Sequence, residues 1–371
     1  MVVIPVALAG RTYEVVIAEG VLARLPEAAA KFLAPYRAGR RVPFVADTTT
    51  RALYGDGIDA SLGAAGFAAD WFIVEPGEDA KSWRVLEALT DWLLALGVTR
   101  SDHVFALGGG VVGDLVGFAC AVLKRGCGFV QIPTTLLAQV DSSVGGKTAI
   151  NTKAGKNLIG AFHQPRLVLI DPDVLATLPE REFRAGMAEV IKYGVIGDPE
   201  LFASLEAAPS GLGDRQAVGP ALLQTLLERS AAAKARVVAA DELEGGLRAI
   251  LNYGHTLGHV VETLTGYGTY LHGEAVGLGM LAAGRIATAL GLWSAADEER
   301  QRRLIAAAGL PVDFPRLEPE AVLQCLQGDK KVREGRVRFV LPTAIGQVVI
   351  RDDVGAAVIH ASLAELGAVP A

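Results

Sequence analysis

The sequence has little cysteine and no cluster of basic residues, and both absences narrow the possible functions. Only three cysteines occur, Cys120, Cys127 and Cys325, and their spacing shows no pairing. We therefore expect no disulfide framework and a reducing, cytoplasmic location. The net charge is -6, without a run of lysine or arginine. Nucleic acid is not an expected partner, because its phosphates require an electropositive surface.

Long hydrophobic runs and targeting signals are also scarce. The most apolar stretch, Ala275 to Trp293, is rich in Gly and Ala and contains Arg285, which is typical of a buried helix rather than a membrane span. The opening residues Met1-Val-Val-Ile-Pro lack the basic start and cleavage site of a secretory signal. We expect no membrane association.

The composition is that of a globular protein. The chain has 371 residues, of which 51% are hydrophobic and 20% charged, and this length suits two domains. Short β-branched runs predict strands at residues 2–8, 13–18, 42–46, 71–74, 104–107 and 129–132. Helical patterns separate the later runs, which predicts an α/β fold with parallel strands. The three residues 9–11 are too few for a crossover, so the first two runs are predicted to form an antiparallel hairpin.

Helical periodicity dominates after about residue 180. It predicts helices at residues 181–195, 221–240, 255–264, 274–290 and 296–308. A late strand pair is predicted at residues 336–341, ending at Pro342, and at residues 347–351. We therefore predict an α/β domain over residues 1–180 and a mostly helical domain over residues 181–371.

A glycine-rich motif follows the predicted strand at residues 104–107. Gly108 to Gly113 match Gly-x-Gly-x-x-Gly between a strand and a helix, where glycines let backbone N–H groups approach a pyrophosphate. The motif predicts a Rossmann-like NAD-binding domain. No acidic residue ends a strand about 20 positions later, so Asp47, which follows an earlier strand, is the better ribose-binding candidate. Glu78 and Lys81 are predicted near the nicotinamide, or else in a solvated turn.

A second motif surrounds Lys147. Gly146-Lys147-Thr148 resembles the end of a Walker A loop, but position 141, where the first glycine should stand, is Asp. A nucleoside triphosphate is therefore not predicted. A lysine between glycines and hydroxyl groups, followed by Lys156 and Asn157, favours a sugar phosphate or carboxylate ligand. The alternative is a structural turn with exposed lysines.

Three of the six histidines lie within one short stretch, at positions 255, 259 and 272. His255 and His259 are four residues apart and share a helix face, so they could bind one metal ion or one substrate together. His272 follows a turn that could bring it back to complete a zinc site with three protein ligands. The alternative is that some of them are core histidines that bond to backbone groups.

Charged residues also occur within apolar surroundings. Glu189 and Lys192 lie three apart on one predicted helix face, and their flanking residues are apolar. A solvated ion pair is the usual meaning of that spacing, but a buried carboxylate needs a partner such as a metal ion. The same question, whether a charged side chain is solvated or buried with a partner, arises on the segment that leads to the histidines, for Lys234, Glu244 and Arg248.

Taken together, these motifs resemble the 3-dehydroquinate synthase family of the sugar phosphate cyclases. Six ordered motifs carry the resemblance, which covers nearly the whole chain: residues 108–114, 141–147, 155–160, 188–193, 252–259 and 272–274. The resemblance implies a Rossmann-like NAD-binding domain and a helical metal- and substrate-binding domain.

The resemblance also implies roles for individual residues. Zn²⁺, with Co²⁺ as a possible substitute, is assigned to Glu189, His255 and His272, while His259 contacts substrate. Substrate or catalytic roles fall to Lys192, Asn252, Arg248, Lys234, Glu244, Asp141, Lys147 and Asn157. With the residues named above, the NAD-binding set is Asp47, Glu78, Lys81, Gly109, Gly110, Val111, Asp114, Thr134, Thr135, Lys147 and Lys156. Arg125 corresponds to an arginine that reaches across a homodimer interface, and Lys330 or Lys331 to a further phosphate contact.

The implied reaction converts 3-deoxy-D-arabino-heptulosonate 7-phosphate to 3-dehydroquinate and phosphate, in the shikimate pathway to aromatic amino acids. It combines transient oxidation by NAD, β-elimination of phosphate, reduction and intramolecular aldol closure.

A related cyclase would lose the carboxylate-binding residues, but Arg248 and Asn252 are present. A metal-dependent polyol dehydrogenase should lack the lysines at 147, 156 and 234. A non-catalytic NAD-binding regulator is disfavoured because the matched catalytic positions are intact.

Overall fold

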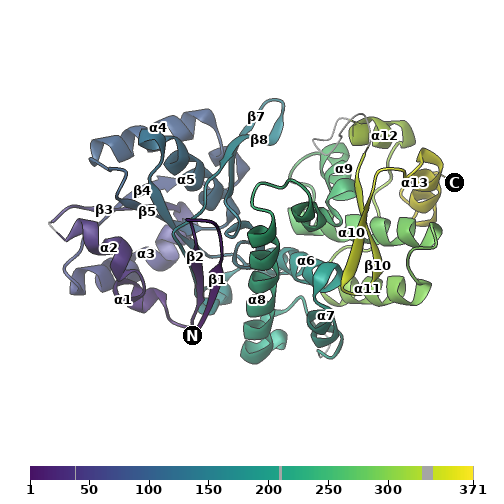
Figure 1. Ribbon diagram of the computed structural model, residues 1–371, viewed down its shortest axis with the longest axis horizontal. Helices are drawn as coiled ribbons and strands as arrows, with labels where there is room; N and C mark the ends of the chain where they lie inside the picture. The colour runs from purple at the N-terminus through teal and green to yellow at the C-terminus, as the bar shows by residue number, and fades with distance from the viewer. Residues whose placement is uncertain (38, 209–210, 328–336, 371) are drawn as a thin grey trace. The chain divides into compact units, whose positions relative to one another are not determined.

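The computed structural model describes residues 1–371 except 38, 209–210, 328–336 and 371. The chain divides into two compact units, which carry the element labels of Figure 1. Unit 1 comprises Met1–Leu178 and Lys234–Glu242, and unit 2 comprises Pro179–Ala233 and Leu243–Ala371. The sequence did not indicate that residues 234–242 group with the first unit.

Unit 1 contains a sheet of seven strands in the order β1-β2-β9-β6-β5-β3-β4. Its strands are β1 (Val2–Val6), β2 (Tyr13–Ile17), β3 (Val42–Asp47), β4 (Ala69–Val74), β5 (His103–Gly108), β6 (Gly128–Pro133) and β9 (Leu167–Ile170). Only the β1–β2 pair is antiparallel, which confirms the predicted hairpin. All six predicted strands form, whereas β9, a run of four buried residues, was not predicted.

Helices cover both faces of this sheet, so a central strand such as β3 is buried and apolar on both sides. The helices of unit 1 are α1 (Leu25–Ala28), α2 (Ala30–Leu33), α3 (Thr48–Ala64), α4 (Trp83–Ala95) and α5 (Gly110–Val122). In β3, Phe44 joins Leu62 of α3 in one core, while the neighbouring Val45 joins Leu115 of α5 in the other. The predicted α/β fold is confirmed.

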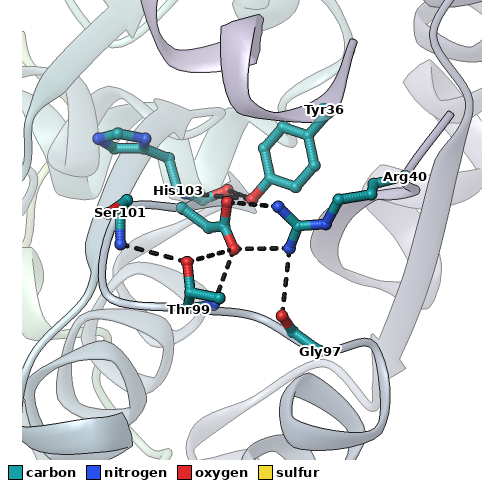
Figure 2. A network of polar contacts seen from close by, with 7 residues as sticks. Tyr36, Arg40, Gly97, Thr99, Ser101 and His103 are labelled. Carbon is teal, nitrogen blue, oxygen red and sulfur yellow. Dashed lines mark hydrogen bonds and ion pairs between the residues drawn. The ribbon is translucent and has the colours of Figure 1, made fainter. Parts of the chain in front are cut away.

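A network of polar contacts fixes the beginning of β5 (Figure 2). Asp102 accepts hydrogen bonds from the Arg40 guanidinium at 2.6 and 2.9 Å and from the Thr99 N–H at 2.7 Å. The Tyr36 hydroxyl donates to the His103 carbonyl at 2.8 Å. Burial lowers the pKa of His103 to about 4, so its ring is neutral near pH 7. The network lies at the opposite end of β5 from Gly108.

A separate hairpin in unit 1 carries part of the lysine motif. Strand β7 (Lys147–Thr152) pairs antiparallel with β8 (Gly155–Phe162) in a two-stranded sheet. Neither strand was predicted, because the segment combines glycines, lysines and asparagines that are uncommon in strands. Much of β8 is exposed, so the usual alternation of apolar and polar residues is absent.

Unit 2 is mainly helical. Its helices include α6 (Glu180–Gly197), α7 (Pro199–Glu206), α9 (His255–Thr265), α10 (His272–Ala289), α11 (Ala295–Ala307), α12 (Pro319–Gln327) and α13 (Ala356–Glu365). Helix α8 (Arg215–Ala240) begins in this unit, and its last residues belong to unit 1. Glycine allows α10 to approach α6, because a Cβ on Gly273 would lie 1.9 Å from the Ala185 carbonyl oxygen.

The late strand pair forms with different bounds from those predicted. Strand β10 (Phe339–Ala344) pairs antiparallel with β11 (Gln347–Arg351). We expected the first strand to end at Pro342, but it continues through Pro342 with an irregular register beside it. A two-stranded sheet has only edge strands, where the missing N–H of proline is tolerated. The predicted start at Arg336, and Lys330 and Lys331, lie outside the described residues.

None of the helices within the described ranges is both long enough and apolar enough to span a lipid bilayer.

Candidate metal and cofactor sites

Two helices of unit 2 begin at a histidine, and a third helix supplies a carboxylate. Helix α9 starts at His255 and α10 starts at His272, while Glu189 lies in the middle of α6. Gly254 precedes α9 with φ +78°, a left-handed conformation in which glycine has no steric penalty. A Cβ at that position would also lie 2.8 Å from the Val276 carbonyl oxygen of α10. The glycine before His255 therefore allows the two histidine-bearing helices to pack closely.

The three side chains converge with metal-ligand geometry. Potential ligand atoms of Glu189, His255 and His272 all lie within 4.8 Å of one another. Glu189 Oε1 is 3.6 Å from His255 Nε2 and 3.9 Å from His272 Nε2. A tetrahedral zinc ion with ligand distances of about 2.1 Å places neighbouring donors about 3.4 Å apart. The donor positions are compatible with one such ion.

An oxygen atom lies beside the Nδ1 atom of each of these two histidines. His255 Nδ1 lies 3.0 Å from the Tyr253 carbonyl oxygen, and His272 Nδ1 lies 3.5 Å from Glu262 Oε2. A proton on Nδ1 leaves the Nε2 lone pair available for a metal. Burial disfavours the charged form of His272, but Glu262 and Glu189 outweigh burial and raise its pKa.

The buried environment of the Glu189 carboxylate also favours a bound cation. Its side chain is 1% exposed, and one oxygen contacts the ammonium of the equally buried Lys192 in an ion pair. Neither oxygen accepts a hydrogen bond of normal geometry from the described residues. A buried carboxylate oxygen that accepts no hydrogen bond can take a metal ion as its partner. The residues present therefore suit a divalent metal ion.

A second group of donors consists of His259, Glu262 and His272. Among the described residues, neither donor group contains both His255 and His259. The co-ligand hypothesis drawn from their spacing is therefore not supported by this geometry, although their ring centroids are 5.8 Å apart. Glu262 was missed by the sequence analysis, but its position seven residues after His255 and three after His259 is a usable helical signal. We call Glu189, His255, His259, Glu262 and His272 the histidine cluster.

Other predicted substrate residues lie in the segment that precedes α9. Arg248 is 1% exposed, within the 3-10 helix Leu247–Asn252. Asn252 donates from its amide to Glu244 Oε1 at 3.1 Å, and Glu244 has φ +60°. The structure thus brings Glu244 and Asn252 together. Glu274, from the same motif as His272, instead accepts from the Leu271 N–H at 2.8 Å and pairs with Arg181.

In unit 1 the glycine motif has the predicted strand-to-helix context. Gly108 ends β5, and Gly109 stands before the first residue of α5, with no side chain of the described residues capping that helix start. Added Cβ atoms would lie 3.1 Å from Thr135 at Gly109 and 3.0 Å from Ser142 at Gly110. Uncapped N–H groups and close packing suit the approach of a pyrophosphate.

The remaining predicted residues near this motif follow neighbouring strands. Asp47 ends β3 and caps α3 by accepting from the Thr50 N–H at 2.9 Å. The Thr134 N–H donates to the Gly108 carbonyl at 3.0 Å. Val111 lies in the first turn of α5. Because the carboxyl ends of parallel strands meet at one sheet edge, Asp47 and the glycine motif share that edge.

A polar cluster in unit 1 centres on Lys81, which is 2% exposed. Its ammonium lies 2.7 Å from Asp114 Oδ2 and also bonds the Asn157 side chain. Burial raises the pKa of Asp114, although Lys81 opposes the rise. Glu78 Oε2 lies 3.7 Å from Lys81 Nζ and accepts from Asn151 at 2.7 Å. We call Glu78, Lys81, Asp114, Asn151 and Asn157 the lysine cluster; the sequence analysis missed Asn151.

Three further lysines occupy different positions in unit 1. Lys234 contacts both the carboxylate and the carbonyl of Asp141, so these two predicted residues lie together. Lys147 begins β7 and Lys156 lies in β8, on the same hairpin as Asn157. No sequence pattern indicated the pairing of Lys234 with Asp141, which are 93 positions apart.

Arg125 lies on an exposed turn after α5, away from the glycine motif at the other end of that helix. Lys124 and Arg125 have φ values of +49° and +66°. Two successive side chains in this sparsely populated region are uncommon, and they mark a turn that the surrounding structure holds in place.

Two family models of known proteins match consecutive parts of the chain. Residues 71–185 match the family model described as 3-dehydroquinate synthase N-terminal, and residues 186–332 match the one described as 3-dehydroquinate synthase C-terminal. A 3-dehydroquinate synthase of Synechococcus sp. (strain CC9605) is 58% identical over 356 residues, which are 95% of this chain and 94% of the relative.

Two solved structures extend the similarity to the fold. ValA, a 2-epi-5-epi-valiolone synthase from Streptomyces hygroscopicus subsp. jinggangensis 5008 with NAD+ and Zn2+ bound, is 33% identical with a TM-score of 0.89. The alignment covers 97% of this chain and 98% of ValA. A 2-deoxy-scyllo-inosose synthase complexed with carbaglucose-6-phosphate, NAD+ and Co2+ is 25% identical with a TM-score of 0.84, and 98% and 100% of the chains are covered.

Proposed function

Since the chain belongs to the 3-dehydroquinate synthase family, we propose that it converts 3-deoxy-D-arabino-heptulosonate 7-phosphate to 3-dehydroquinate and phosphate. The observation that carries the proposal is similarity over nearly the full length of the chain. Two family models match it, and the Synechococcus relative is 58% identical. The reaction is a carbon–oxygen lysis followed by ring closure, within aromatic amino acid biosynthesis. Residues 1–180 are proposed to bind NAD, and residues 181–371 the metal and substrate.

The cofactors of the related cyclases suit the residues of this chain. Glu189, His255 and His272 would hold Zn²⁺, or Co²⁺ in its place, and the glycine motif at 108–113 would hold the pyrophosphate of NAD. When bound, NAD supplies a hydride acceptor that is regenerated in each turnover, and the metal supplies a Lewis acid for substrate oxygens.

The side chains of the histidine cluster then have distinct tasks. Lys192 stands against Glu189 and can exchange a proton with a substrate hydroxyl group near the metal. His259 is absent from the donor group of Glu189, and it is proposed to contact substrate, as the family resemblance implies. The Tyr253 carbonyl fixes the ring of His255, and Glu262 fixes that of His272.

The remaining predicted residues are proposed to bind the substrate's anionic groups. Arg248 and Asn252 favour a carboxylate, which distinguishes this substrate from those of cyclases whose substrates lack one. Lys147, Lys156 and Lys234 favour the phosphate, which a polyol dehydrogenase would not bind. Arg125 is proposed to enter the neighbouring site of a homodimer. The location proposed for the enzyme is the cytoplasm.

The proposed function is tested by incubating the purified protein with the heptulosonate phosphate, NAD+ and Zn²⁺. Phosphate release and absorbance of NADH are followed together. We expect phosphate release that depends on NAD+ without net NADH, because the same hydride returns to the substrate. NADH that accumulates in step with phosphate would assign the protein to the dehydrogenases instead. Sedoheptulose 7-phosphate serves as the substrate control for a related cyclase.

A further inference from the structure

Asn151 is the last residue but one of β7, in the hairpin of unit 1, and joins three segments of the lysine cluster. Its side-chain amide donates to Glu78 Oε2 at 2.7 Å and to the Glu78 carbonyl at 3.1 Å. Its side-chain oxygen accepts from the Asn157 N–H at 3.0 Å, and its own N–H donates to the Lys81 carbonyl at 2.7 Å. One residue therefore holds the loop at residues 78–81 against the β8 strand.

The contacts form a closed circuit around Lys81. The Asn157 side chain accepts from the Lys81 ammonium, while its backbone has φ +55°. That left-handed conformation is accessible to asparagine but not its usual one, so the hydrogen bond from the Asn157 N–H to Asn151 helps to hold it. Loss of Asn151 would release Asn157 on one side of Lys81 and Glu78 on the other. The ion pair between Lys81 and Asp114 would remain.

We propose that Asn151 is a positioning residue for NAD binding. It sets the direction of Glu78 and of the Lys81 ammonium without itself contacting the reacting atoms. The inference rests on the proposed function, in which Glu78, Lys81 and Asp114 bind NAD. A neutral amide is required at position 151, since its NH₂ group faces a carboxylate and its oxygen faces an N–H.

The first experiment measures the Kd of NAD+ by calorimetry on the intact, zinc-loaded protein. Asn151→Ala is expected to raise this Kd about tenfold, because misdirected Glu78 and Lys81 side chains would forfeit one to two hydrogen bonds to NAD. Thr152→Ala is the matched control, because the Thr152 hydroxyl bonds within the turn of the same hairpin, to Gly155 and Ala154, and to no other described residue. Its Kd should stay within about twofold of the unaltered protein.

A second pair of variants tests the contact with Glu78. Asn151→Asp is nearly isosteric and keeps the acceptor for Asn157, but it places a carboxylate against Glu78. It should weaken NAD binding more than Asn151→Ala does. In a Glu78→Gln background the amide introduced at position 78 can donate to the carboxylate introduced at position 151. The additional loss of NAD+ affinity caused by Asn151→Asp should then fall to about twofold or less.

Kinetic measurements distinguish a positioning role of Asn151 from a role in the stability of the hairpin. A positioning role raises the KM for NAD+ while kcat at saturating NAD+ and the zinc content change little. The inference is overturned if Asn151→Ala leaves the Kd unchanged, if Thr152→Ala weakens binding equally, or if Asn151→Asp loses the same factor in both backgrounds. Failure of the unaltered protein to bind NAD+ would instead reject the proposed function.

Discussion

The histidine cluster of unit 2 and the lysine cluster of unit 1 are built on different kinds of support. The histidine cluster stands on α6, α9 and α10, and His255 and His272, the two histidines proposed as metal ligands, each begin a helix. The lysine cluster joins a loop, α5 and an exposed hairpin through hydrogen bonds between side chains. Packed helices can hold metal donors at strict distances, whereas loops adapt to a larger ligand. Substitutions in the two clusters should therefore affect different ligands.

The largest effect is expected from His272→Ala. Two remaining donors seldom hold zinc tightly, so the bound metal and the activity should both fall to a few per cent or less. Metal content by mass spectrometry and turnover are measured on the same preparation, with NAD+ binding as the readout for unit 1. His360→Ala, on α13, is the histidine control. Full zinc content in His272→Ala would remove that residue from the metal site.

The same contrast explains how much of the molecule could be predicted from sequence. Strands β1 to β6 and helices α6, α9, α10 and α11 follow from local periodicity and were predicted within a few residues, whereas α7, α12 and α13 were not predicted. Glu262 was also within reach, because it shares a helix face with His259. The contacts of Asn151 could not be predicted from sequence, since its partners Glu78 and Lys81 lie some 70 positions away.

The hairpin shows the same limit at the level of secondary structure. Strands β7 and β8 lack apolar alternation, and their pairing with one another is decided by contacts such as that between Gly160 and Thr148. The assignment of Glu189 as a proposed metal ligand required the family resemblance, because a Glu and a Lys three residues apart usually form a solvated pair.

His259→Ala should separate substrate binding from metal binding within the histidine cluster. We expect zinc to remain while turnover falls about 100-fold, a typical loss for a side chain that transfers protons or orients the reacting groups. Zinc content and kcat are measured together, and His255→Ala provides the comparison in which metal should be lost. Equal metal loss in both variants would restore the hypothesis that the two histidines bind one ion.

Mixing variant subunits tests whether Arg125 of one subunit and Lys192 of the other contribute to one active site across a dimer interface. Arg125→Ala and Lys192→Ala subunits are each expected to be inactive alone. Random reassociation should recover about one quarter of the normal activity, because half of the dimers are hybrids with one intact site. Tagged subunits are used to demonstrate the hybrids. Hybrids without activity would reject a shared site.

Glu262→Gln should weaken the metal site less than removal of a ligand does. The glutamine can still accept from His272 Nδ1 but carries no charge, so we expect zinc affinity to fall about tenfold and further in Glu262→Ala. Competition with a chelator gives the affinity. Metal analysis of the unaltered protein is the internal check: two ions per chain would make Glu262 a ligand in its own right rather than a partner of His272.

The smallest effect on either cluster is expected from Asp102→Asn, in the network of Figure 2. This carboxylate lies at the opposite end of β5 from Gly108, so zinc and NAD+ binding should not change. Stability should fall by about 2 kcal/mol, because a buried carboxylate that is bonded to Arg40 and Thr99 is lost. Chemical denaturation measures the loss, and Asp91→Asn on the exposed face of α4 is the control.

The pH dependence of that loss identifies its origin. Burial disfavours the charged form of Asp102, but the Arg40 and Thr99 hydrogen bonds outweigh it and lower its pKa. A carboxyl group with a lowered pKa stabilises the fold above its unfolded pKa of about 3.9, and this stabilisation disappears as the pH falls through the folded value. The difference between Asp102→Asn and the unaltered protein should therefore be constant near neutral pH and shrink below about pH 4. A difference that persists unchanged in acid would show that packing, rather than the charge of Asp102, stabilises the start of β5.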